Sequence, residues 1–176
     1  IQKLEQIGEK PLRFLRYFIM ANYDTSAEKD GILREDRLYA WICSNNDQCH
    51  YEEAPFQFVQ KMWQSVLLYV NARSPKHLDN GNIHLVNIPL LAGRSYKLHL
   101  MLILAAANMN PDALAQFKRI LESVVYYTVI DKVATNITER TFASWCRGLR
   151  RIITLEELNA FVSNTILPVV SEWKQD

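Results

Sequence analysis

The sequence predicts an all-α protein: an irregular bundle of six or seven helices around a central apolar helix, with one long irregular connection. Two observations favour this fold class. The 176 residues include only five glycines, and sheets and tight turns use glycine more heavily than helices do. The stretch from Leu98 to Ala107 is apolar nearly all round, which is typical of a helix that other helices surround.

Three helices are expected before residue 73. The first runs from about Leu12 to Asn22 with Pro11 in its first turn, and the second is a short helix within residues 34–45. The third, within residues 54–72, repeats apolar residues at helical spacing. Its predicted buried face comprises Val59, Met62, Trp63, Val66, Leu67 and Val70.

Residues 73–94 are predicted to form a long loop. Pro75, Gly81, Pro89 and Gly93 punctuate the segment, and residues 79–82 (DNGN) are typical of a turn. A connection of this length inside a compact domain is often functional or mobile.

The second half of the chain carries clearer helix signals. Asn110 is expected to cap a helix that runs from Pro111 to about Val133. Capping boxes are expected at residues 136–139 and 154–157, and the last helix should bend or stop near Leu167 because Pro168 interrupts the hydrogen-bond ladder. The predicted core contains Phe18, Trp63, Leu67, Leu102, Leu104, Phe117, Leu121 and Val125.

The composition excludes several classes of protein. Twenty Lys and Arg residues balance 19 Asp and Glu residues, so no global basic field exists to hold nucleic acid. No apolar run approaches the roughly 20 residues that a membrane span needs. The odd, sparse set of cysteines, Cys43, Cys49 and Cys146, indicates a reducing compartment, so we expect a cytoplasmic protein.

No constellation for catalysis, metal or cofactor binding is evident. Cys43, Cys49 and His50 lack the spacing and the second ligand pair of a zinc site. His84 and His99 fit no metalloprotease pattern, and the chain contains no phosphate-binding glycine loop. We therefore expect no catalytic residue, no metal and no cofactor.

One charge cluster stands out. Arg147, Arg150 and Arg151 share a helical face if the helix persists, and Arg140 lies on roughly the same side seven residues earlier. Such a face could contact DNA phosphates. The alternative is an ordinary solvated helix end, where basic residues complement the helix dipole.

Residues 14–23 (FLRYFIMANY), followed by residues 31–41 (GILREDRLYAW), resemble the helical region of the domain-of-unknown-function 262 family, the GmrSD-like restriction and phage-defence proteins. Residues 97–110 and 113–145 resemble the paired central helices of the same family. The resemblance implies two partners, an N-terminal ParB/sulfiredoxin-like, nucleotide-sensing domain and a C-terminal HNH-type nuclease domain. The chain has neither the Asp-Gly-Gln-Gln-Arg motif nor the His-Asn-His constellation of those parts.

The resemblance implies a helical coupling scaffold in a restriction-type anti-phage protein. We expect residues 1–176 to be a single helical domain, cut from a longer chain because no initiator Met is present. Arg13 and Arg16 would then contact a neighbouring domain, and Arg140, Arg147, Arg150 and Arg151 could contact DNA. Two alternatives stay open: a protein–protein interaction module without a nucleic-acid role, and a small helical enzyme built from scattered residues such as His84, Tyr96 and His99.

Overall fold

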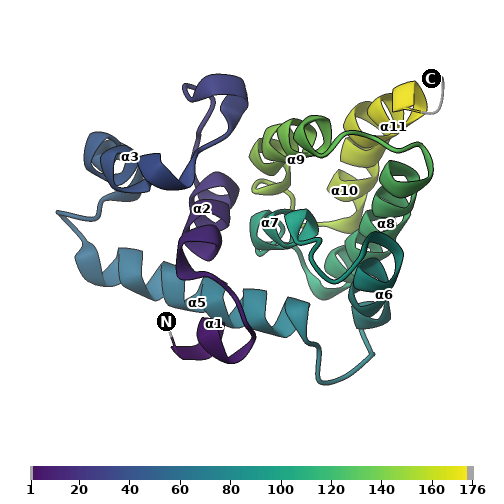
Figure 1. Ribbon diagram of the computed structural model, residues 1–176, viewed down its shortest axis with the longest axis horizontal. Helices are drawn as coiled ribbons and strands as arrows, with labels where there is room; N and C mark the ends of the chain where they lie inside the picture. Colours follow the sequence, from purple (N-terminus) through teal and green to yellow (C-terminus); the bar gives the residue numbers. More distant parts are fainter. Residues whose placement is uncertain (1, 174–176) are drawn as a thin grey trace.

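The computed structural model describes residues 2–173, and it confirms the all-α fold class, since no strand occurs among them (Figure 1). Short 3-10 turns at residues 29–31 and 35–37 lie between the second and third helices. The helices are α1 (Gln2–Gln6), α2 (Pro11–Asn22), α3 (Leu38–Ser44), α4 (Asn46–Cys49), α5 (Pro55–Arg73), α6 (Asn82–Ala92), α7 (Leu98–Ala105), α8 (Pro111–Ile130), α9 (Thr135–Leu149), α10 (Leu155–Phe161) and α11 (Leu167–Trp173).

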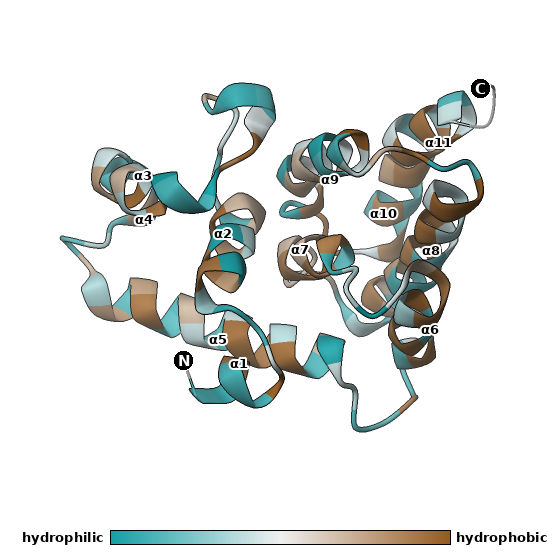
Figure 2. Cartoon of the chain, in the orientation of Figure 1, coloured by the Kyte–Doolittle hydropathy of each residue, from teal (hydrophilic) through white to brown (hydrophobic). Residues whose placement is uncertain are grey.

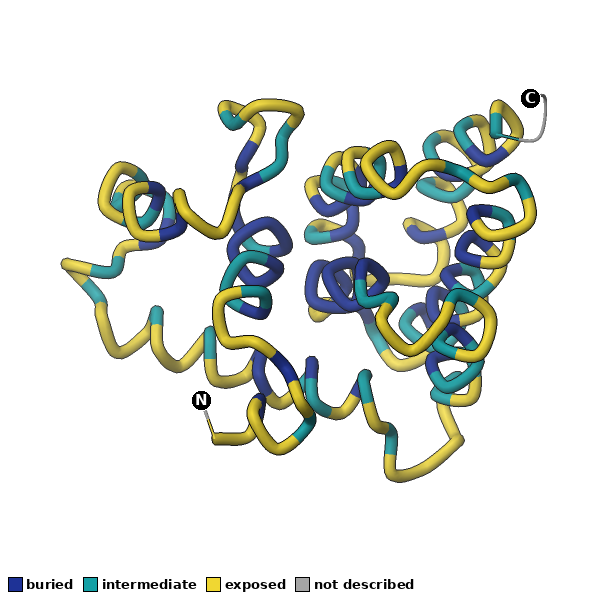
Figure 3. Tube along the Cα trace, viewed as in Figure 1, coloured by how far each residue is buried: buried dark blue, intermediate teal, exposed yellow. Residues whose placement is uncertain are grey.

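The apolar helix α7 lies at the centre, as the sequence predicts. All eight of its residues are buried, and Figure 3 shows it as a continuous buried segment. Helices α2, α5 and α9 pack against it, while α6 and α11 pack against α8. The apolar side chains of α7 are buried by these neighbours, which stabilises the fold because apolar surface is removed from water.

Most predicted helix ends are confirmed. The Asn110 side chain accepts a hydrogen bond from the Ala113 amide at 2.8 Å, and Thr154 and Glu157 form a reciprocal capping box. The capping box expected at Asn136 does not form, because Ala134, two residues earlier, occupies the N-cap position of α9. Before Pro168 the chain widens into a π-helical turn at residues 162–166, as expected for a proline that cannot continue the ladder.

The prediction of a long loop over residues 73–94 is wrong in its second half. Helix α6 occupies residues 82–92 and makes extensive contact with α8. Gly81 begins it with a left-handed backbone (φ +75°), and Pro89 lies inside it. Burial of Leu85 and Ile88 against the neighbouring helices outweighs the hydrogen bond that Pro89 removes.

The expected buried face of α5 is also partly wrong. Of the eight predicted core residues, six are buried, but Trp63 is 47% exposed and Leu67 is 41% exposed. Val66 is buried as predicted, and the other buried residues of α5 are Ser65, Tyr69 and Ala72. The helix is therefore rotated relative to the prediction, so that Ser65, Tyr69 and Ala72 face the core while several large apolar side chains face solvent.

Candidate functional site

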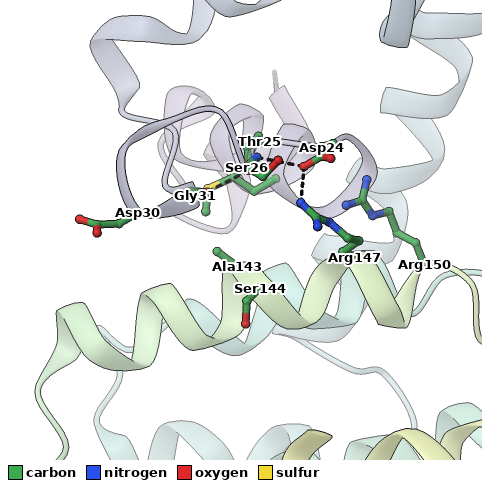
Figure 4. Close-up of a pocket in the computed structure, with 10 residues that line it drawn as sticks. Asp24, Thr25, Ser26, Asp30, Gly31, Ala143, Ser144, Arg147 and Arg150 are labelled. Atoms are coloured by element: carbon green, nitrogen blue, oxygen red, sulfur yellow. Dashed lines mark hydrogen bonds and ion pairs between the residues drawn. The ribbon is translucent and has the colours of Figure 1, made fainter.

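The predicted arginine cluster faces a loop that is distant in sequence. The loop at residues 24–31 follows α2, and α9 lies opposite it (Figure 4). Between them is a pocket of about 210 Å³, which we call the loop groove. Its lining comprises Met20, Asp24, Thr25, Ser26, Asp30, Gly31, Ala143, Ser144, Arg147 and Arg150.

Arg147 is paired with Asp24 across the loop groove. Its Nη2 atom donates to Asp24 Oδ1 at 2.9 Å, as the dashed line in Figure 4 marks. The amide of Ser26 donates to the same oxygen at 2.9 Å. Hydrogen bonds from the Ser26 backbone and side chain, with a smaller contribution from Arg147, lower the pKa of Asp24 to about 2. Asp24 is therefore ionised at neutral pH and partly neutralises Arg147.

Arg140 makes a second pair with the same loop. Its Nη2 atom lies 3.0 Å from Asp30 Oδ2, and both side chains are partly exposed. Asp30 has a left-handed backbone (φ +60°), a conformation that Asp tolerates better than most residues. The two pairs attach the loop to α9 at two points about two helical turns apart.

The other two arginines behave differently. Arg150 is half-buried, its Nε atom donates to the Cys146 carbonyl at 3.1 Å, and burial lowers the pKa of its guanidinium. Arg151 is exposed. Two of the four predicted DNA-binding arginines thus have their charge offset by carboxylates, which argues against a continuous phosphate-binding face.

Of the two arginines expected to contact a neighbouring domain, Arg16 is occupied inside the chain. Its guanidinium pairs with Glu139 of α9, and its Nε atom donates to the Leu33 carbonyl. Arg13 lies 3.7 Å from Glu9 and keeps 29% of its side chain exposed. Arg16 therefore holds α2 against α9 and the 31–35 segment, and contact with a neighbouring domain stays a prediction for both arginines.

The residues of the enzyme alternative do not form a reactive group. His84 on α6 pairs with Glu122 on α8, whereas His99 is buried in α7 against the ring of Tyr96. Burial lowers the pKa of His99 to about 3, so it is neutral and withdrawn from solvent.

The cysteine-rich segment likewise forms no metal centre. Cys43 is exposed, whereas Cys49 is buried and its thiol lies 3.2 Å from the Asn45 carbonyl. In the described part of the chain, no three His, Cys, Asp or Glu side chains are arranged to hold a metal. Within residues 2–173, every helix also falls short of the length and apolar character that crossing a membrane requires.

Sequence reasoning missed an apolar surface on α5. Phe56, Val59, Trp63 and Leu67 form an exposed stripe at spacings of three or four residues, which we call the α5 face. Beside it, α1, α2 and α5 enclose an apolar groove of about 290 Å³, lined in part by Leu12 and Val59. The one available signal was that apolar residues occupy more than one side of this helix.

Comparison with protein-family models, with curated proteins and with solved structures gives no match. The functional proposal therefore depends on the side-chain geometry described above.

Proposed function

We propose that this chain is a helical coupling scaffold of a restriction-type defence protein, which docks a neighbouring protein domain on the α5 face. The observation that carries the proposal is the stripe of exposed apolar side chains beside an apolar groove. Phe56 is 89% exposed, Val59 is 53% exposed and Trp63 is 47% exposed. Figure 2 shows apolar segments along α5, and Figure 3 shows exposed residues on the same helix.

A contiguous apolar surface of this kind is typical of protein-binding sites. Isolated exposed apolar residues are common, but a stripe that borders a groove marks a surface that another molecule covers. Trp63 is suited to anchor a partner because tryptophan is enriched among residues that dominate binding energy. Lys3 lies 5.5 Å from the centre of the Trp63 ring, where its ammonium group orients the ring by a cation–π contact.

The ion pairs of α9 suit a rigid scaffold better than a DNA-binding face. Arg16, Arg140 and Arg147 each use a carboxylate from a segment more than 100 residues away. The Arg16 pair fixes α2 against α9, and the Arg140 and Arg147 pairs fix the segment after α2 against the same helix. A domain that couples two partners needs such cross-links, since a movement is transmitted only through packed elements.

The docking test is photo-cross-linking in the protein expressed from its complete open reading frame. A benzophenone amino acid replaces Val59 on the α5 face, and in a control protein it replaces Leu90, which is 77% exposed on α6. The probe at Val59 should attach to another domain or to a second protein, and the probe at Leu90 should not.

A variant strengthens this test. Trp63→Asp should abolish the cross-link from position 59, while circular dichroism shows an unchanged helix content because the Trp63 side chain is half exposed. A cross-linking pattern that is identical at positions 59 and 90 would contradict docking on the α5 face.

The DNA alternative is measured separately. Fluorescence anisotropy with a duplex oligonucleotide, repeated at several salt concentrations, compares the parent with the Arg147→Ala, Arg150→Ala, Arg151→Ala triple variant. A scaffold without DNA contacts gives no salt-dependent binding. Binding that fades steeply with salt, and that the triple variant loses, would favour the DNA-contacting form of the scaffold.

A further inference from the structure

A second pocket lies on a different side of α2 from the α5 face. It has a volume of about 420 Å³, and its lining comes from α2, the last residue of α6, the segment that leads into the first residue of α7, and the first residue of α9. We call it the α7–α9 pocket. Its lining comprises Arg13, Tyr17, Ala92, Ser95, Tyr96, Lys97, Leu98 and Thr135.

The charged lining of this pocket is basic. Arg13 and Lys97 both contribute to it, and no carboxylate does. The nearest acidic partner is Glu9, whose side chain is fully buried and lies 3.1 Å from Lys97 Nζ and 3.7 Å from Arg13 Nη1. One carboxylate against two cations leaves one positive charge beside the pocket.

Glu9 has no capacity left to neutralise that charge. Its Oε2 atom already accepts a hydrogen bond from the Tyr69 hydroxyl at 2.7 Å, and its Oε1 atom accepts one from the Lys10 amide at 3.0 Å. Arg13, by contrast, has five N–H donors and makes only the long contact to Glu9. The arginine can therefore bind an anion without giving up a hydrogen bond.

Tyr17 supplies a neutral donor. It is only 4% exposed, yet it lines the pocket, and its hydroxyl makes no hydrogen bond to any described residue. Burial raises the pKa of Tyr17 to about 12, so its hydroxyl stays protonated and able to donate at neutral pH. Ser95 and Thr135 add hydroxyl groups at the rim.

Two helix ends add to this electrostatic environment. Leu98 begins α7 and Thr135 begins α9, and both residues line the pocket. Neither helix has a side-chain cap, whereas α8 and α10 are capped by Asn110 and Thr154. Backbone N–H groups of uncapped first turns favour a nearby negative charge.

We propose that the α7–α9 pocket binds the phosphate group of a small molecule through Arg13, Lys97 and the Tyr17 hydroxyl. The pocket is several times larger than a single water site, so it has room for a phosphate group. The proposal does not depend on docking at the α5 face, which uses other residues.

Isothermal titration calorimetry in low-salt buffer tests the proposal with three probes: inorganic phosphate, adenosine monophosphate and adenosine. Phosphate or the nucleotide should bind with a dissociation constant of about 1 mM or tighter. Adenosine should not bind, because it lacks the charged group. Tighter binding of the nucleotide than of phosphate would identify a nucleotide as the source of the phosphate, and equal binding would identify phosphate itself.

Two variants test whether Tyr17 and Arg13 bind the phosphate group. Tyr17→Phe keeps the buried ring and removes only the hydroxyl, and it should weaken binding about tenfold. Arg13→Gln should weaken it at least as much. Arg151→Gln removes an equal charge beyond the opposite end of α9 and should leave binding unchanged. The Trp63→Asp variant should also bind normally.

The melting temperature of each variant is measured so that loss of binding is not confused with unfolding. If Arg13→Gln proves unstable, Tyr17→Phe decides the outcome. The proposal is overturned if neither phosphate nor the nucleotide binds, if adenosine binds equally well, or if Tyr17→Phe binds as tightly as the parent.

Discussion

Replacing the buried His99 with Leu should remove most of the acid sensitivity that this residue gives the fold. His99 is 2% exposed, its Nδ1 atom has no hydrogen-bond partner, and its ring stacks on Tyr96 at 5.8 Å. Burial is the main cause that lowers its pKa from 6.5 to about 3, and the charge of Arg73 lowers it further. The folded protein therefore keeps His99 neutral at a pH where the unfolded chain is already protonated.

The sign and size of the change in unfolding free energy with pH follow from this difference in proton uptake. Below pH 6.5 the unfolded state binds a proton that the folded state refuses, so the free energy of unfolding falls as the pH falls. The slope is about 1.4 kcal/mol per pH unit, and it continues until the pH approaches the folded-state pKa. Between pH 6.5 and pH 4.5 the cost is therefore about 2–3 kcal/mol.

Urea unfolding followed by circular dichroism at pH 7.5, 5.5 and 4.5 measures the effect. His99→Leu should match the parent within about 1.5 kcal/mol at pH 7.5, since the swap is apolar and of similar volume. His99→Leu should lose about 2–3 kcal/mol less than the parent by pH 4.5. Exposed His77 provides the control, because His77→Gln should keep the parent's pH dependence. Equal losses in the parent and in His99→Leu would refute the reasoning.

Three further predictions concern stability. Leu102 is fully buried in α7, so Leu102→Ala should cost about 2–5 kcal/mol in reversible unfolding, and a loss below about 1 kcal/mol would contradict the central position of α7. A Cβ atom at Gly148 would lie 2.4 Å from the Phe161 ring. Gly148→Ala should therefore lower the free energy of unfolding by about 1–3 kcal/mol, although Ala has the better helix propensity. A variant more stable than the parent would be inconsistent with this packing. A double-mutant cycle of Asp24→Ala and Arg147→Ala should give a coupling free energy of about 1 kcal/mol or less, because both side chains are at least half exposed. This coupling should fade as the pH falls towards about 2, where Asp24 becomes protonated. A much larger coupling would mean that the pair is shielded from solvent.

The parts of the fold that were predictable from sequence depend on local chemistry. Asn110 before Pro111, and Thr154 three residues before Glu157, mark helix starts because the capping hydrogen bonds form within a few residues. The central position of α7 was predictable because apolar residues on every side of a helix can be buried only by neighbours on every side.

The errors have a common physical origin in tertiary contacts. Residues 82–92 were predicted to form part of a loop because Pro89 lies among them, yet contacts with α8 stabilise helix α6 there. On α5, periodicity does not decide which of two apolar sides faces the core, and the side containing Ser65, Tyr69 and Ala72 is the one that packs inward. For the candidate site, no local pattern could show that Arg147 meets Asp24, because the two residues are 123 positions apart.

The position of α2 has a consequence for the order in which the chain folds during synthesis. Its buried residues Phe18, Ile19 and Met20 lie on a helix whose packing partners α7 and α9 are about 80 and 120 residues further along the chain. On the ribosome, α2 therefore emerges long before those helices, and until they follow only the segment after α2 and α5 are available to cover part of its apolar surface. The nascent protein should acquire protease resistance in a single late step, and a fragment that ends before α7 should require a chaperone to remain soluble.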